Sequence, residues 1–212
     1  MGNVPKKRRV LTRLLPVAYV VLWGCTPTTI LPPHVPSASG LERGVAVNAL
    51  AFDEDPSRGD WTNPRQYRIG GGVSSWLLSA GEESDSAWVI HGGFPNVMGV
   101  GRSYRKHIAK TDRVYLGLSA SAGLFWLNGG LPMALALKDG VWLYSQPTIA
   151  PIPVQEVLAF HIPIGLAHET RAGNRIFHEL GFRQQPNLKY NPSPGDPALN
   201  TFYYSLGIGQ PR

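Results

Sequence analysis

Residues 114–126 read VYLGLSASAGLFW, and the strict alternation of this stretch decides the class of fold. One set of alternate positions is apolar, and the other set holds mainly Gly and Ser with two aromatic residues. A period of two over this length is typical of a β-strand with two different faces and argues against a helix. The apolar set is Val114, Leu116, Leu118, Ala120, Ala122, Leu124 and Trp126, and the opposite set is Tyr115, Gly117, Ser119, Ser121, Gly123 and Phe125.

Two further segments alternate in the same way. Residues 158–167 set five large apolar residues against Ala159, His161, Pro163, Gly165 and Ala167, and residues 202–209 set Phe202, Tyr204, Leu206 and Ile208 against Tyr203, Ser205, Gly207 and Gly209. Weaker strand candidates are 44–52, 66–79, 86–94, 97–108, 131–137, 140–148 and 174–184, of which 86–94 and 97–108 could form one long bent strand. The pattern therefore predicts either eight or about ten strands.

The connections between these strands fall into two kinds. Short polar segments at 80–85, 109–112, 138–139 and 171–173 suit hairpin turns, whereas 53–65 and 185–199 are longer, contain proline and suit exposed loops. With 24 glycines and 19 prolines the chain offers no stretch after Cys25 with a convincing helical period.

The faces of the strands indicate their environment. In a soluble sandwich or barrel the outer face carries many charged residues, but here the less apolar face carries mainly Gly, Ser, Ala and Tyr. Small residues suit the interior of a narrow closed barrel, so the aliphatic face is expected to point at lipid. The sequence thus predicts an all-β, antiparallel, up-and-down transmembrane β-barrel of about 8–10 strands. Aromatic residues in or near the strand ends are candidates for an interfacial girdle: Trp76, Trp88, Trp126, Trp142, Tyr104, Tyr144 and Tyr204.

The first 25 residues have the layout of an export signal. A basic leader containing Lys6, Lys7, Arg8, Arg9 and Arg13 precedes an apolar run, which ends at Gly24-Cys25. Leu22-Trp23-Gly24-Cys25 resembles the lipobox of bacterial lipoprotein signals, although Trp23 stands where a small residue is usual. The resemblance implies cleavage before Cys25 and a covalent lipid on that cysteine. An ordinary signal cut near Ser37-Ala38-Ser39 and an uncleaved anchor are the alternatives.

On this basis the chain divides into a signal peptide (1–24), a lipid-anchored tether rich in Pro, Ser and Thr (25–43) and a β-barrel domain (44–212). The barrel domain is similar, in strand pattern and glycine usage, to small bacterial outer-membrane β-barrel proteins. That resemblance implies an outer-membrane location with both termini in the periplasm, and it implies membrane lipid, the lipoprotein export machinery and the outer-membrane assembly machinery as partners. The C-terminal residues Gly207 to Arg212 depart from the family, whose members usually end on an aromatic residue.

The sequence provides no clear catalytic or metal site. His168-Glu169 and His178-Glu179 lack a second histidine four residues after the first, and Gly117–Ser121 lies within a strand rather than at a nucleophile elbow. No cofactor is expected apart from the covalent lipid. The net charge of +6 falls to +1 without the leader, so the charge gives no reason to expect a nucleic-acid partner.

One constellation of polar residues is a candidate site. Strand parity places six polar residues on the same face as the small residues: Arg68, His91, Arg105, His161, Glu179 and Arg183. Inside a barrel they would form a polar network, either as a plug that satisfies the interior or as a positively biased path for small anions.

These observations favour a lipid-anchored outer-membrane barrel with a structural, binding or narrow-channel role and no catalysis. The alternative is a soluble periplasmic β-domain on a lipid tether that binds a partner or an apolar ligand. A membrane-embedded lipid hydrolase would need a serine–histidine pair, which the sequence does not assign.

Overall fold

The computed structural model describes residues 40–53, 67–94, 99–123, 126–152, 157–185 and 199–211. These residues form twelve β-strand segments: β1 Gly40–Asp53, β2 Tyr67–Ala80, β3 Ser84–Phe94, β4 Gly99–Lys110, β5 Val114–Gly123, β6 Trp126–Gly130, β7 Met133–Lys138, β8 Val141–Ser145, β9 Thr148–Ile152, β10 Val157–Glu169, β11 Arg175–Gln185 and β12 Leu199–Pro211. In these ranges we find no helix of the length and apolarity that crossing a membrane requires.

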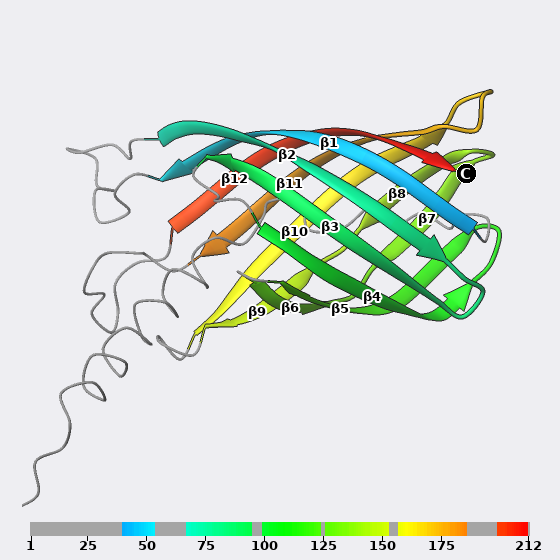
Figure 1. The fold of residues 1–212 in the computed structure, drawn as a ribbon, viewed down its shortest axis with the longest axis horizontal. Coiled ribbons are helices and arrows are strands. Elements are labelled where there is room, and N and C mark those ends of the chain that lie inside the picture. Colours follow the sequence, from blue (N-terminus) through cyan, green and yellow to red (C-terminus); the bar gives the residue numbers. More distant parts are fainter. Residues whose placement is uncertain are drawn as a thin grey trace, which may run out of the picture.

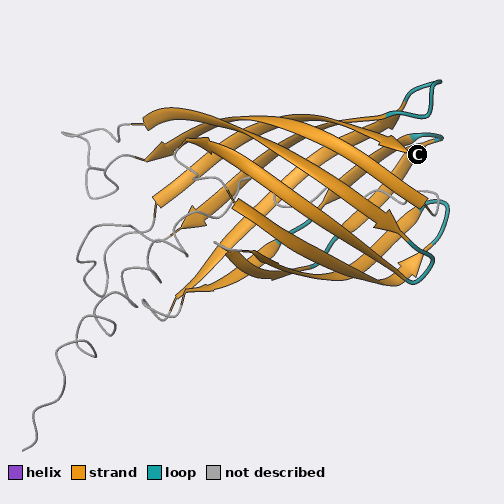
Figure 2. Ribbon diagram, viewed as in Figure 1, coloured by secondary structure: helices purple, strands orange, loops and turns teal. Residues whose placement is uncertain are grey.

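The strands form one antiparallel sheet that closes on itself (Figures 1 and 2). Consecutive strands pair with one another around the wall, and β12 returns to pair with β1, with Val45 opposite Ile208. Within the described ranges the wall has ten strand positions, because β6 and β7 share one and β8 and β9 share another. The predicted all-β antiparallel barrel is confirmed, with the larger of the two strand numbers.

Proline explains why two wall strands are divided. The register between β6 and β9, with Gly130 opposite Thr148, continues unchanged between β7 and β8, with Met133 opposite Ser145. Pro132 lies between β6 and β7, and Pro147 lies between β8 and β9. A proline has no N–H to give to the ladder, so each strand is interrupted where the ring occurs without losing its register.

The two ends of the barrel differ. One end, here called the turn end, holds the short turns 81–83, 111–113, 139–140 and 170–174 (Figure 2). β1 begins and β12 finishes at this same end, since Gly40 pairs with Ala80 beside the first turn and Glu42 pairs with Pro211. The opposite end is called the far end. The predicted loops 53–65 and 185–199 lie almost entirely outside the described residues.

Three predicted boundaries differ from the structure. The strand expected across 114–126 ends at Gly123, and Trp126 instead begins β6, directly opposite Gly123. The apolar alternation continues through this connection, so the pattern alone does not reveal the change of strand. Segments 86–94 and 97–108 correspond to two separate paired strands, β3 and β4. β1 begins at Gly40, so the last residues of the segment assigned to the tether lie in the wall; Cys25 and the whole leader fall outside the described residues.

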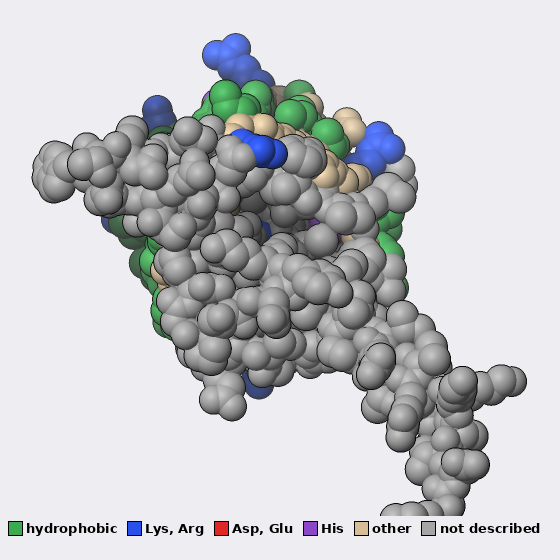
Figure 3. All heavy atoms as spheres, turned by 90° about the vertical axis from the view of Figure 1, so that its left-hand side faces the viewer, with side chains coloured by type: hydrophobic (Ala, Val, Ile, Leu, Met, Phe, Trp, Pro, Cys, Tyr) green, Lys and Arg blue, Asp and Glu red, His purple; other side chains and the backbone are tan. Residues whose placement is uncertain are grey.

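The two faces of the wall contact different surroundings. Outward-facing side chains are predominantly large and apolar, and inward-facing side chains are polar, aromatic or small. In the end-on view of Figure 3, hydrophobic side chains cover the visible flanks and a few Lys and Arg side chains project at the edge. The inward aromatic residues of the turn-end half form one buried cluster together with Leu78, Val89 and several alanines.

Glycine and aromatic residues are paired across the ladder inside the barrel. Four buried aromatic rings each lie over the glycine directly opposite on a neighbouring strand, and a Cβ on any of these glycines would overlap the ring: Gly44 with Trp76, Gly165 with Tyr144, Gly181 with Tyr203, and Gly207 with Phe177. The glycines therefore provide space for rings that fill the interior.

Candidate functional site: the polar interior of the barrel

The six predicted interior residues do not all lie inside the barrel. His91, Arg105, His161, Glu179 and Arg183 are buried, whereas Arg68 is exposed. Arg68 is the second residue of β2, at the rim of the far end, so the wall does not enclose its long side chain even though its parity is that of the interior.

Arg105 takes part in one side-chain cluster, and His161 and Glu179 take part in another. A first cluster at the turn end joins Glu42 of β1 to Arg175 of β11, with 3.1 Å between Oε2 and Nη1. The indole Nε1 of Trp76 donates to the other oxygen of Glu42 at 3.3 Å, and Arg175 also lies 3.5 Å from Glu169. Both Glu42 and Arg175 are 2% exposed, so this ion pair is shielded from water. None of these four residues was among the predicted six.

A second ion cluster occupies the same half of the barrel. Nη2 of Arg105 lies 3.4 Å from Asp85 Oδ2, and Nε2 of His107 lies 3.2 Å from Asp85 Oδ1. The imidazole of His107 also packs edge-on against Tyr115, with ring centroids 5.2 Å apart. The Gly81 N–H at the first turn donates to Asp85 at 3.2 Å. The charge of Arg105 is thus offset by a buried carboxylate that also ties the interior to a turn.

A third cluster contains two of the predicted residues. The hydroxyl of Tyr203 donates to Glu179 Oε1 at 2.7 Å, and His161 Nε2 lies 2.6 Å from the same hydroxyl. Nδ1 of His161 lies 3.5 Å from Thr148 Oγ1. Because the single hydroxyl proton of Tyr203 is given to Glu179, the His161 Nε2 must carry a proton and donate to the tyrosine oxygen. The chain from Glu179 to Thr148 crosses four strands and links them through side chains.

The chemistry of these clusters is that of internal structural contacts. Each carboxylate bonds to a cation or a hydroxyl, and large aromatic rings occupy the adjacent space. In the described ranges, no three His, Cys, Asp or Glu residues lie close enough together to hold a metal ion. The arrangement fixes strands relative to one another and leaves the two charge clusters of the turn-end half internally compensated.

Sequence reasoning missed Glu42, Asp85, Arg175 and Tyr203. Asp85 has the parity of His91 on β3, and Arg175 has the parity of Glu179 on β11, so extending the parity argument to the strand ends would have found both. Glu42 was assigned to the tether. Its role depends on where β1 begins, which composition did not reveal.

The predicted aromatic girdle is partly wrong. Trp76, Trp142 and Tyr144 are buried inside the barrel. Three other members lie on the outer face: Trp88, Tyr104 and Tyr204. The side chain of Trp126 falls outside the described residues. Aromatic residues suit both an interface and an interior, and only the parity of the neighbouring residues distinguishes the two.

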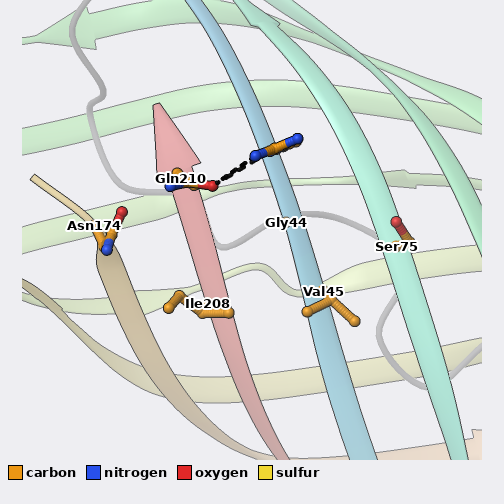
Figure 4. Close-up of a pocket in the computed structure, with 7 residues that line it drawn as sticks. Gly44, Val45, Ser75, Asn174, Ile208 and Gln210 are labelled. Atoms are coloured by element: carbon orange, nitrogen blue, oxygen red, sulfur yellow. Dashed lines mark hydrogen bonds between the residues drawn. The ribbon is translucent and has the colours of Figure 1, made fainter. Parts of the chain in front are cut away.

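A shallow pocket of about 340 Å³ lies on the outer surface at the turn end (Figure 4). The side chains of Val45 and Ile208 lie along it, on the paired strands β1 and β12. Nη2 of Arg43 donates to Gln210 Oε1 at 3.0 Å at its edge. The pocket therefore places one arginine beside the apolar outer face, at the rim of the barrel.

Comparison with known proteins gives only distant similarity. No family model and no curated protein sequence matches the chain. Among solved structures, Neisserial surface protein A is 10% identical with a TM-score of 0.39, covering 84% of this chain and 100% of that one. Ail, the attachment invasion locus protein of Yersinia pestis, is 13% identical with a TM-score of 0.25, covering 81% and 98%. These values are too low to transfer any property from either protein.

Proposed function

We propose that this chain is a lipid-anchored β-barrel of the bacterial outer membrane, with a structural or binding role and without catalysis. The observation that carries the proposal is the outer face, where large apolar side chains are exposed on strands all around the wall. Ile69 is 82% exposed and Leu180 is 65% exposed, on strands that are not neighbours. A soluble domain rarely exposes a continuous apolar surface of this kind, whereas the hydrocarbon of a bilayer is the solvent that suits it.

The dimensions of the wall support the same proposal. A tilted strand needs roughly 9–11 residues to cross the hydrocarbon layer. The undivided strands reach this length, from 10 residues in β5 to 14 in β1 and β2. A closed barrel also leaves no strand edge unpaired in lipid. Arg102 stands on the outer face, and its guanidinium carbon lies 5.7 Å from the centre of the Trp88 ring, which gives the cation an aromatic partner.

The orientation follows from the two ends. In bacterial outer-membrane barrels the short turns face the periplasm, and an even strand number leaves both termini there. The turn end of this barrel has the short turns, the start of β1 and the end of β12. On this proposal Arg43 lies at the periplasmic interface, and a lipid on Cys25 reaches the inner leaflet of the same membrane.

The interior favours a plugged barrel over an anion path. Arg105, one of the six residues of the anion hypothesis, is paired with the buried Asp85, and aromatic rings fill the adjoining space. Placing a passing anion beside Arg105 would require breaking that pair in a low-dielectric interior. We therefore assign the buried charges to holding strands together, and we assign any binding role to the surfaces outside the interior.

Membrane extraction tests the proposal most directly. The protein and a Cys25→Ala variant exported through a substitute leader are treated with alkaline carbonate. If the barrel is embedded, the variant stays in the membrane pellet, and both proteins show heat-modifiable gel mobility. Release of the variant while the lipidated protein stays bound would favour the soluble periplasmic domain instead.

Planar-bilayer recordings test the plug. The unaltered protein and Arg105→Glu are both expected to give no steady conductance. A steady anion-selective conductance that Arg105→Glu reverses would restore the anion path.

A further inference from the structure

Three prolines lie on adjacent strand positions, along one line of paired residues across the barrel wall. Pro132 separates β6 from β7, Pro147 separates β8 from β9, and Pro163 lies in the middle of β10. The continuous registers place Pro132 and Pro163 on either side of Gln146, with Pro147 next to it. We call this line of residues the proline seam.

Each proline takes a position where the ladder needs an N–H donor. Gly117 donates to the carbonyl of Pro132 at 2.9 Å, and Leu131 donates to the carbonyl of Pro147 at 3.0 Å. In a regular antiparallel ladder each pair would exchange a second bond, which a proline cannot return. Three consecutive strand pairings are affected, because Pro163 removes a bond from the third.

The position of Pro163 follows from the alternation of the ladder. Glu169 donates to Gly140 at 2.8 Å, which marks a hydrogen-bonded pair between β10 and the strand containing β8. Such pairs recur at every second residue, so Pro163, six residues earlier, is at another. The hydroxyl of Ser145 donates to the Pro163 carbonyl at 2.5 Å and satisfies that acceptor with a side chain. The backbone is therefore less tightly paired along the seam than elsewhere in the same strands.

An apolar groove lies on the outer face beside the seam. It has a volume of about 470 Å³, within the range of ligand-sized pockets. The side chains along it come from four strands and are almost wholly hydrocarbon: Leu116, Met133, Leu135, Leu143, Ile162 and Ile164. The hydroxyl of Ser145, also at the groove, is already used by the Pro163 carbonyl. The groove thus offers dispersion contacts and no site for a charged or hydrogen-bonding ligand.

We propose that this groove, beside the proline seam, binds one hydrocarbon chain of a membrane lipid. The inference rests on the proposed membrane location and goes beyond it by naming one place on the wall. The groove extends from the seam, midway along β10, toward the turn end through Met133 and Leu143. On the proposed orientation this places it in the half of the hydrocarbon layer that lies nearer the turn end. A wall with fewer backbone bonds along the adjoining seam can adjust to the bound chain.

Photolabelling in vesicles tests this site. The protein is placed in phosphatidylcholine vesicles containing a phospholipid with a diazirine near the middle of one chain, and labelled residues are mapped by mass spectrometry. We expect labelling of β8 and β10 to exceed that of the outer face of β1 and β2 several-fold. Leu143→Trp, which fills the groove, should reduce labelling of Ile162 and Ile164, and Val73→Trp on the opposite wall should not.

The outcomes separate this proposal from the one on which it rests. Equal labelling around the wall would overturn the groove while leaving the membrane location intact. Absence of labelling on every strand would overturn the membrane location and the groove together. Mapping of the unaltered protein does not depend on how the tryptophan variants fold, and their heat-modifiable mobility shows whether they do.

Discussion

Glu42→Gln should destabilise the barrel more than any change on its outer rim. The substitution removes the charge opposite Arg175 but keeps the shape of the side chain and an acceptor for the Trp76 indole. Removing one member of a buried ion pair typically costs about 3–5 kcal/mol, because the other charge is left in a medium of low dielectric constant. Glu169 remains 3.5 Å from Arg175 and is half exposed. We therefore expect about 3 kcal/mol, at the lower end of that range.

The assay is reversible urea unfolding in detergent micelles, followed by tryptophan fluorescence and gel mobility. A loss of about 3 kcal/mol raises the unfolded-to-folded ratio more than a hundredfold, since about 1.4 kcal/mol corresponds to a factor of ten. Arg43→Gln is the matched control, because Arg43 adjoins Glu42 in sequence but points outward to Gln210. Its effect should stay within about 0.5 kcal/mol.

A double-mutant cycle with Arg175→Met determines whether the ion pair is the cause. If the two residues stabilise the barrel through their pairing, the double variant costs much less than the sum of the single variants. The reasoning would be refuted if the double variant lost as much stability as the two single variants together, to within about 0.5 kcal/mol. It would also be refuted if Glu42→Gln cost no more than Arg43→Gln.

The other predictions concern the interior packing and the seam. Gly207→Ala should lower the free energy of unfolding in urea by about 1–3 kcal/mol, because the added Cβ would overlap a buried ring. Gly129→Ala is the tolerated control, since its Cβ would meet its nearest atom at 3.6 Å. Equal costs for the two variants would contradict the steric explanation. Pro147→Val should stabilise the barrel by about 1 kcal/mol, because the new backbone N–H can donate to the Leu131 carbonyl. The expected sign is slower amide hydrogen exchange in β8 and β9. Tyr203→Phe should cost about 1–3 kcal/mol, because two buried groups lose the hydroxyl they share; an unchanged unfolding midpoint would show that the third cluster does not stabilise the fold.

The sequence predicted the fold well where each strand meets two environments. Val114 and Leu118 point outward and Ser119 and Ser121 point inward, as their alternation indicated. A shift of one residue would move every side chain to the other face, so the pattern of a long strand determines its orientation without knowledge of its partners. The same reasoning identified five of the six predicted interior residues by parity.

Contacts between strands were beyond the reach of that pattern. Glu42 and Arg175 are 133 residues apart, and they meet only because closure of the barrel brings β1 and β11 to opposite sides of β12. Parity states which face a residue occupies, but the height at which it lies depends on register. For this reason the sequence suggested one interior network and did not identify the partners that Arg105 and Glu179 have in the structure, Asp85 and Tyr203.

An inward glycine in this barrel indicates a large side chain opposite it on the neighbouring strand, and it does not indicate a narrow barrel. The many small inward residues suggested a narrow interior, yet the wall has ten strand positions, the larger of the two expected numbers. Gly181 and Gly207 are small because Tyr203 and Phe177 lie across them, so the volume absent from one strand is supplied by the next. A ten-stranded wall encloses more space than eight strands do, and rings laid over glycines fill part of that space. The same pairing accounts for a barrel that is both wider than its small residues imply and filled in its turn-end half.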